Sequence, residues 1–254
     1  MSYTATGVNA GLILIGNELL SGKTKDANMN VIAKFCGEEG IDLVEVAVIP
    51  DIEATIISKV REFSERFDHV FTTGGIGPTH DDITAASIAK AFDLELETNE
   101  SAKEVLIDFY KDKINDSRLS MAKMPKGSEL ICNSISIAPG FKTKNVHVMA
   151  GIPKIMQSML QSLSGNIKGG KKIISTTYKL YVKESDIADF LYELDDTYRD
   201  KIEIGSYPFK EEAPERFGTR IVFRSNHEPF IVEASEKLVS FCHNTFDQDC
   251  ISKE

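Results

Sequence analysis

The segment Phe71-Thr-Thr-Gly-Gly-Ile-Gly-Pro-Thr-His-Asp-Asp-Ile-Thr84 decides both the fold and the candidate site. It follows an apolar strand expected at residues 69–73 and opens a helix expected at residues 82–92. Its glycines let the backbone approach a ligand closely, and the N–H groups at a helix start favour an anion. A tight turn with Thr79 or Asp81 as the helix N-cap explains the same residues. The glycines alone therefore leave both interpretations open.

Two adjacent carboxylates shift the balance towards a ligand. Asp81 and Asp82 would repel a phosphate held by the turn unless a cation bridged them. A hard divalent ion such as Mg²⁺ takes one or two carboxylates together with phosphate oxygens, and Mn²⁺ or Co²⁺ is an alternative. His80 beside them is a candidate acid, base or metal ligand. The segment therefore predicts a metal-assisted phosphate site.

Strands and helices alternate around this segment. Strands are expected at residues 11–15, 43–49, 129–132 and 146–149, and helices at residues 28–39, 52–67, 101–114 and 154–163. Asp51 is expected to cap the second of these helices, and Pro153 to open the last. Alternation of this kind predicts βαβ units, hence an α/β fold with a mostly parallel sheet and helices on both faces.

A second polar loop, residues 16–28, also follows a strand and carries Glu18, Ser21, Asp26 and Asn28. Open α/β sheets bind ligands beyond the carboxyl ends of their parallel strands. The Gly22-Lys-Thr24 step matches the end of a P-loop, but Gly16 lies one residue too far away for that motif. A turn at Asn17 and a helix cap at Asp26 are the structural alternatives.

Composition limits the function. The net charge of −10 argues against a nucleic-acid surface, which needs clustered Lys and Arg. The four cysteines show no C-x-x-C spacing, which indicates reduced thiols rather than a zinc site or disulfides. The amino terminus lacks a signal-peptide pattern, and no stretch approaches the ~18 apolar residues of a membrane span. We expect a cytoplasmic protein that binds neither membrane nor nucleic acid.

A Gly-, Ser- and Lys-rich stretch at residues 164–172 marks the domain boundary. We expect a first domain at 1–164, a linker at about 165–172 and a small α+β domain at 173–254. In the latter, strands are expected at 173–182, 202–206 and 220–223, and helices at 185–194 and 229–241. Its Gly205-Ser-Tyr-Pro208 and Arg216-Phe-Gly-Thr-Arg220 segments place a tyrosine and arginines near a nucleotide. A strand-end turn and a solvated charged rim explain them equally well.

Three spaced motifs together resemble the MoaB/Mog molybdopterin-binding family. They are G-N-E-L-L-S-G with Asp26 and Asn28, T-T-G-G-I-G-P-T-H-D-D-I-T, and A-P-G-F followed by A-G-I-P. The P-T-x-D-D-x-T form specifically resembles the competence/damage-inducible CinA proteins and the amino-terminal domain of eukaryotic FAD synthase. The resemblance spans about residues 9–164, and the G-S-Y-P and F-G-T-R segments resemble the smaller domain that follows in those proteins.

The resemblance implies a three-layer α/β domain and a homo-oligomer, dimeric or trimeric. It implies either molybdopterin binding or metal-dependent hydrolysis of a nucleotide pyrophosphate such as ADP-ribose or FAD. Two departures matter. The chain lacks the C-terminal nicotinamide-nucleotide deamidase domain common in CinA proteins, so we expect that activity to be absent. Ile155 stands where the family usually has a glutamate, and the sequence leaves open whether that glutamate serves activity or structure alone, so binding is better supported than catalysis.

The candidate residues fall into three groups. The matching motifs place Glu18, Asp26, Thr73, Gly74, Gly75, Asp81, Asp82 and Asn133 at the site. Glu18, Asp81 and Asp82 are candidate catalytic residues, and Asp26, Asp81 and Asp82 are candidate metal ligands. The candidate ligand-binding residues are Asn17, Ser21, Gly22, Asn28, Thr73, Gly74, Gly75, Gly77, Pro78, Thr79, Thr84, Asn133, Pro139, Gly140 and Gly151.

Two principal hypotheses follow for a small nucleotide or pterin ligand. The first is a metal-dependent hydrolase of an ADP-ribose- or FAD-like pyrophosphate. The second is a molybdopterin or nucleotide binding protein without turnover, and a scaffold whose oligomer matters more than its pocket is a third. Acidic clusters in two loops favour the first, because a simple phosphate binder would use Lys or Arg there. Lys23 and Lys25 weaken that preference.

Overall fold

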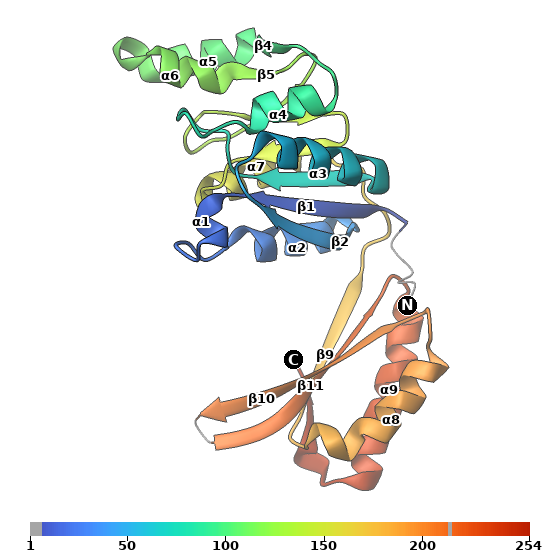
Figure 1. Cartoon of the computed structure of the whole chain (residues 1–254). Coiled ribbons are helices and arrows are strands. Elements are labelled where there is room, and N and C mark those ends of the chain that lie inside the picture. The colour runs from blue at the N-terminus through green and yellow to red at the C-terminus, as the bar shows by residue number, and fades with distance from the viewer. Residues whose placement is uncertain (1–6, 213–214) are drawn as a thin grey trace. The chain divides into compact units, whose positions relative to one another are not determined.

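The computed structural model describes residues 7–212 and 215–254, which form two compact units, residues 7–170 and 171–254. The predicted first domain starts within residues 1–6, which lie outside the described residues. The division between Gly170 and Lys171 falls inside the stretch predicted as a linker. Each unit has a sheet and a core of its own (Figure 1).

The first unit is built on a six-stranded sheet of order β2-β1-β3-β8-β7-β6. Its parallel part comprises β1 (Asn9–Ile15), β2 (Asp42–Ile49), β3 (His69–Thr73) and β8 (Val146–Met149). The antiparallel pairs are β7 (Gly140–Thr143) with β8 and β6 (Glu129–Ile131) with β7. The predicted α/β class and mostly parallel sheet are confirmed.

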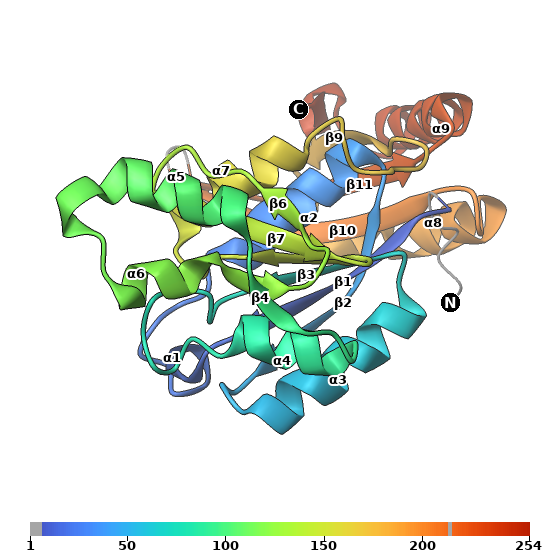
Figure 2. The same cartoon turned by 90° about the horizontal axis from the view of Figure 1, so that it is seen from above.

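Helices cover both faces of this sheet and make the unit three-layered (Figure 2). On one face, α3 (Glu53–Arg66), α4 (Thr84–Ala91) and α5 (Glu100–Tyr110) pack through a core that includes Val60, Phe63 and Leu106. On the other face, α2 (Asn28–Glu39) and α7 (Pro153–Leu163) pack through Ile32 and Met159. The alternation of buried strands with amphipathic helices produces this arrangement, because each helix has only one apolar stripe to bury.

Short elements complete the first unit. A two-stranded ribbon of β4 (Leu96–Thr98) and β5 (Lys123–Pro125) flanks α5. Single turns are formed by α1 (Asn17–Leu20), α6 (Asp116–Leu119) and the 3₁₀ segments η1 (Lys111–Lys113) and η2 (Ser120–Ala122). Strands β4, β5 and β7 were not expected from the sequence.

The segment after α7 packs against the first unit at the amino-terminal edge of the strands. The N–H of Gly170 donates to the carbonyl of Gly40 at 3.0 Å, just before β2. Nε2 of His69, the first residue of β3, lies 2.9 Å from the Lys168 carbonyl, and its Nδ1 lies 3.2 Å from Nε2 of His147. Residues up to Gly170 are therefore held by hydrogen bonds.

His147 is buried in this core, 2% exposed, with its ring stacked on Phe71 at a centroid distance of 5.1 Å. Burial, with His69 and Lys142 nearby, lowers the pKa of His147 to about 3. The hydrogen bonds form one chain if Nε2 of His69 donates to the Lys168 carbonyl and Nε2 of His147 donates to Nδ1 of His69. The Nδ1 atom of His147 then faces the core as an acceptor with no hydrogen-bond partner in the described residues.

The second unit has the element order β-α-β-β-α-β of the ferredoxin-like motif. Its elements are β9 (Ile174–Leu180), α8 (Glu184–Thr197), β10 (Glu203–Glu212), β11 (Glu215–Ser225), α9 (Glu228–Thr245), η3 (Gln248–Cys250) and β12 (Ile251–Lys253). The antiparallel sheet has the order β10-β11-β9-β12. Both long helices pack on one face of it, around Leu180, Ile221 and Phe223 (Figure 1). Strands β10 and β11 are much longer than expected.

All four cysteines are free thiols. Cys36, Cys242 and Cys250 are buried, whereas Cys132 is exposed. Burial raises the pKa of Cys36 and of Cys242 to about 12, which makes both thiols poor nucleophiles. Among the helices of residues 7–212 and 215–254, none combines the length and the apolar character that crossing a membrane requires.

Candidate functional site

Four loops meet at the carboxyl ends of the parallel strands in the first unit. The N–H of Gly16, after β1, donates to the carbonyl of Ile49 in β2 at 3.1 Å. The N–H of Gly74, after β3, donates to the carbonyl of Met149 in β8 at 3.1 Å. Neighbouring strands thus bring loops far apart in sequence to one sheet edge, as the parallel topology predicts.

The glycine turn after β3 depends on its glycines for geometric reasons. Gly74 and Gly75 have φ values of 105° and 67°, in the region that favours glycine. A Cβ at Gly74 would lie 2.1 Å from the carbonyl oxygen of Ile15, and one at Gly75 would lie 2.2 Å from Oγ1 of Thr84. That Oγ1 donates to the Gly74 carbonyl at 3.0 Å. The turn is closed against β1 and α4.

Both predicted carboxylates of this loop converge on one hydroxyl. Oδ1 of Asp81 and Oδ2 of Asp82 each lie 2.5 Å from Oγ1 of Thr79, so they are at most 5 Å apart. The backbone N–H of Thr79 also donates to Asp82 at 2.8 Å. A hydroxyl has one proton and donates to one acceptor at a time, so only one of the two carboxylates accepts a hydrogen bond from Thr79 Oγ1. The oxygen of the other carboxylate lies 2.5 Å from Oγ1 with no hydroxyl proton between the two atoms.

The surroundings of Asp81 favour its charged form. The Thr79 hydroxyl, followed by the Asp81 backbone N–H and the charge of His80, lowers the pKa of Asp81 below its usual value. Asp81 and His80 are exposed, while Asp82 is half-buried against Gly77, where a Cβ would lie 2.7 Å from Oδ2. The loop therefore places one exposed and one half-buried carboxylate beside a glycine turn.

The loop after β1 is bound by Asp51, which lies after β2 and for which the sequence predicted a different role. Asp51, expected to cap α3, makes no such bond. Its Oδ2 instead accepts from the N–H of Asn17 at 2.8 Å. That prediction was wrong, because the carboxylate finds a donor 34 positions earlier in the chain. The carboxylate of Glu18 folds back over Gly16, where a Cβ would lie 2.5 Å from Oε1.

Asp26 serves the helix start. Its two oxygens accept from the N–H groups of Asn28 and Met29 at 3.2 and 3.0 Å, which is the capping alternative considered above. Asn28 is 5% exposed, and its amide donates to the carbonyl of Gly151 at 2.8 Å. Its Oδ1 atom is buried and has no partner within the described residues. Asn28 thus ties two loops together and keeps one acceptor free.

The loop between β6 and β7 is stabilised by its own asparagine. Asn133 donates to Ser136 Oγ at 2.6 Å and to the Ala138 carbonyl at 3.0 Å. Its Oδ1 accepts from the N–H groups of Ile135 and Ser136. This predicted ligand residue therefore shapes its own loop. Pro139 and Gly140 are buried, whereas Gly151 is exposed.

The remaining predicted residues differ in access. Asn17, Ser21, Gly22 and Pro78 are exposed, whereas Thr73 is buried beneath the turn. No group of three or more His, Cys, Asp or Glu side chains is positioned to hold a metal within residues 7–212 and 215–254. The structure thus brings Asp81 and Asp82 together and engages Asp26 elsewhere.

Large aliphatic side chains surround the same edge, a feature that sequence periodicity could not reveal. Each is about half exposed, and they come from the loops after β1, β2, β6 and β8 and from the first turn of α2: Leu20, Ile52, Ile135, Ile152 and Met29. Exposed apolar groups around polar loops are typical of ligand and partner sites.

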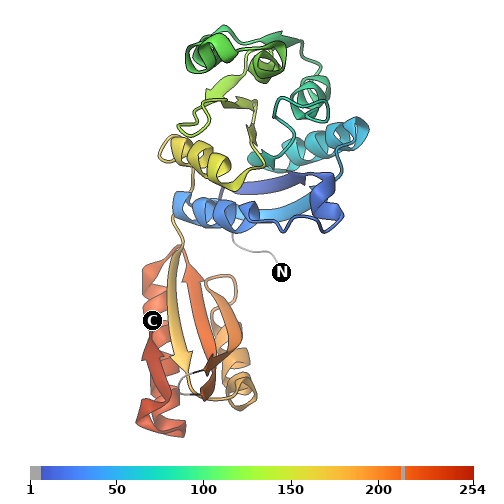
Figure 3. The ribbon, with the colours of Figure 1, turned by 90° about the vertical axis from the view of Figure 1, so that its left-hand side faces the viewer.

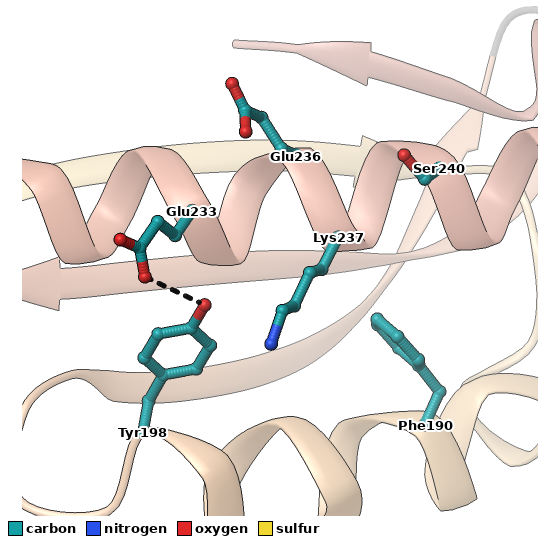
Figure 4. Close-up of a pocket in the computed structure, with 6 residues that line it drawn as sticks. All are labelled: Phe190, Tyr198, Glu233, Glu236, Lys237 and Ser240. Atoms are coloured by element: carbon teal, nitrogen blue, oxygen red, sulfur yellow. Dashed lines mark hydrogen bonds between the residues drawn. The ribbon is translucent and has the colours of Figure 1, made fainter.

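The second unit has a separate hollow of 490 Å³ between α8 and α9 (Figure 4). Phe190, Tyr198 and Lys237 line it, and the Lys237 ammonium lies 5.0 Å from the centroid of the Tyr198 ring. The Tyr198 hydroxyl donates to Glu233 at 3.5 Å. The hollow contains none of the predicted site residues.

Fold and loops define an α/β protein of the molybdopterin-binding class. Residues 11–168 match the family described as a probable molybdopterin binding domain, and residues 172–246 match the middle domain of FAD synthase. The first match covers more than half of the chain, which therefore belongs to that family.

Within it, the chain is CinA-like. It is similar to the structure of a CinA protein of unknown function from Thermoplasma acidophilum, with 30% identity and a TM-score of 0.60, over 64% of this chain and 99% of that one. A protein of Archaeoglobus fulgidus is 34% identical over 78% of this chain and 84% of its own length. A protein of Pyrococcus horikoshii is 31% identical over 84% and 87%.

Proposed function

We propose that the chain is a divalent-metal-dependent hydrolase of a nucleotide pyrophosphate of the ADP-ribose or FAD kind. The observation that carries this proposal is the convergence of Asp81 and Asp82 on the Thr79 hydroxyl, each at 2.5 Å. The two carboxylate oxygens lie at most 5 Å apart, and a cation between them would offset the repulsion of their charges.

The residues present fit a lightly coordinated metal. Mg²⁺ commonly keeps several waters and uses one or two carboxylates together with phosphate oxygens, so a third protein ligand is not required. Asp81 and Asp82 would hold the ion, and Asp26 would not, because both of its oxygens cap α2. When bound, the ion would polarise a phosphate and lower the pKa of an attacking water.

The chain's own groups then bind and orient the substrate. The glycine turn at Gly74, Gly75 and Gly77 holds the loop that carries the carboxylates, and the low pKa of Asp81 keeps that carboxylate charged. The carboxylate of Glu18, exposed on the neighbouring loop, is the candidate acceptor for a proton from water. The exposed aliphatic side chains at the edge suit the flat heterocycle of a nucleotide.

Purified full-length chain would be tested against ADP-ribose, FAD and NAD with Mg²⁺, Mn²⁺ or Co²⁺. Asp82→Asn and Asp81→Asn nearly preserve shape and remove charge, so hydrolysis of the best substrate should fall by about a hundredfold or more. Asp93→Asn is the matched control, since that exposed aspartate lies after α4 and forms an ion pair with Arg61 at 3.4 Å. Circular dichroism would check that each variant folds. Wild-type rates in both site variants would contradict the proposal.

The alternative is a molybdopterin or nucleotide binding protein without turnover. Ile155 favours it, because this partly buried residue packs into the core where the resembling proteins usually carry a glutamate. The two functions separate in a titration of ligand with and without Mg²⁺. Carboxylates that hold a metal give weaker binding in Asp82→Asn, whereas carboxylates that only repel phosphate give tighter, metal-independent binding. We also propose that the chain acts as a closed homo-oligomer in the cytoplasm.

A further inference from the structure

The Gly205–Pro208 and Arg216–Arg220 segments lie side by side inside the long hairpin of the second unit. Tyr207 pairs with Arg220 across β10 and β11, and Gly205 pairs with Val222. The interpretation of Gly205–Pro208 as a strand-end turn is therefore wrong. Side chains alternate between sheet faces, and Ile221 and Phe223 point to the helices. Tyr207 and Arg220 therefore lie on the open face, towards which Figure 3 looks.

Two glycines make room for aromatic rings on this face. A Cβ at Gly205 would lie 2.7, 2.8 and 3.0 Å from three atoms of the Tyr207 side chain. A Cβ at Gly218 would lie 2.7 Å from the Phe209 ring. Neither glycine has a positive φ. Glycine weakens a strand interior and often marks close approach of another group. At Gly205 the approaching group is the ring of Tyr207, whereas at Gly218 a Cβ would also lie 2.1 Å from the backbone carbonyl oxygen of Leu180.

Of the aromatic rings on this face, Tyr207 alone is free for a ligand among the residues described. Phe209 lies under Arg220 and Lys179, at 4.8 and 5.2 Å from its centroid. Tyr181 lies under Arg216 at 5.1 Å. Tyr207 is 54% exposed, and no cation is placed over its ring in the described part of the chain.

The open face carries slightly more positive than negative charge in a unit that is acidic as a whole. Residues 171–254 contain 12 Lys and Arg against 17 Asp and Glu. Among the described residues of the open face, Lys179, Arg220 and Arg224 form ion pairs with Glu203, Glu211 and Glu254, and Arg216 lies over the Tyr181 ring. An exposed ring beside arginines is the pairing that recognises a flat base carrying a phosphate.

We propose that this face binds a nucleotide, with the base stacked on the outer side of Tyr207 and the phosphate paired with Arg220 or Arg224. Among the described residues of this face one ring is free, so the face accepts one base, whereas proteins that bind single-stranded nucleic acid stack successive bases on several rings. The proposal needs neither Asp81 nor Asp82 and no metal, and so stands apart from the proposed hydrolysis.

The test uses the full chain in EDTA, with AMP as the probe in isothermal titration calorimetry. EDTA silences a metal-dependent site, so failure here leaves the hydrolase proposal intact. Tyr207→Ala should weaken AMP binding by about tenfold or more, the usual effect of losing one stacked base. Phe217→Ala is the matched control, because Phe217 is 61% exposed on the same hairpin but on the opposite face. It should bind AMP like the wild type.

Gly205→Ala keeps the tyrosine but pushes its ring away, and it should also weaken binding. Adenosine and ribose 5-phosphate should each bind more weakly than AMP, since each lacks one half of the recognised pair. The proposal is overturned if AMP does not bind in EDTA, or if Tyr207→Ala and Phe217→Ala bind it equally. It is also overturned if a ten-nucleotide single-stranded RNA binds much more tightly than AMP.

Discussion

Replacing Gly74 with alanine tests whether the glycine turn is imposed by its surroundings. The new Cβ would meet the Ile15 carbonyl oxygen at 2.1 Å, and φ of 105° is unfavourable for alanine. Backbone strain of this kind costs about 1–3 kcal/mol. Relieving the clash requires the turn to move from β1, which would break two hydrogen bonds. These are the bonds from Gly74 to Met149 and from Thr84 to Gly74, worth about 0.5–1.5 kcal/mol each.

Gly127→Ala separates the two contributions. Gly127 has φ of 78° but nothing within 4 Å of its would-be Cβ, so it bears the conformational cost alone. We therefore expect Gly74→Ala to be less stable than Gly127→Ala by about 1–3 kcal/mol, the value of the two lost bonds. Urea unfolding followed by circular dichroism measures this difference, and any transition of the second unit should stay unchanged. Equal midpoints for the two variants would refute the argument that β1 closes the turn.

Two further predictions concern pH and assembly. The pKa of His147 is about 3 in the folded state, below the value of about 6.5 in the unfolded state. Its contribution to the free energy of unfolding is therefore complete above pH ~6.5 and is lost as the pH falls towards 3, because the unfolded chain takes up the proton first. Between pH 7 and 5 the free energy of unfolding should therefore fall by about 2 kcal/mol more in the wild type than in His147→Phe, as measured by urea unfolding. Parallel pH profiles for the two proteins would contradict this prediction. Sedimentation equilibrium at micromolar concentration should show a closed homo-oligomer, and a monomer would contradict that proposal.

Periodic segments were predictable from the sequence, whereas short strands and contact-dependent roles were not. Helix α2 begins and ends at the residues predicted, because its apolar positions recur at helical spacing and Gly40 follows. Strand β12 has only three residues and acquires its structure by pairing with β9. Strands β10 and β11 were predicted too short, because their outer parts are rich in charged residues and pair in the ladder with each other rather than with β9.

In the candidate site, too, features within one loop were predictable from the sequence, whereas contacts between distant parts of the chain were not. The carboxylates Asp81 and Asp82 share one short loop, so sequence proximity was enough to bring them together. Asp51 and Asn28 act across 34 and 123 positions of the chain, and no local pattern reports such contacts. Asn133 matches a family motif, yet its hydrogen bonds are all made within its own loop. Motif matching locates a loop but does not say which atoms of it remain free.

The distribution of thiols gives this chain a built-in attachment point for a spectroscopic probe. Three of the four cysteines are buried, and Cys132 is exposed immediately before Asn133, in the loop between β6 and β7. A maleimide dye or nitroxide added to the unaltered protein would therefore be directed to that one position. Its signal would report on the edge of the sheet where the loops meet, so that loop movement on adding metal or nucleotide can be followed without introducing or removing any cysteine.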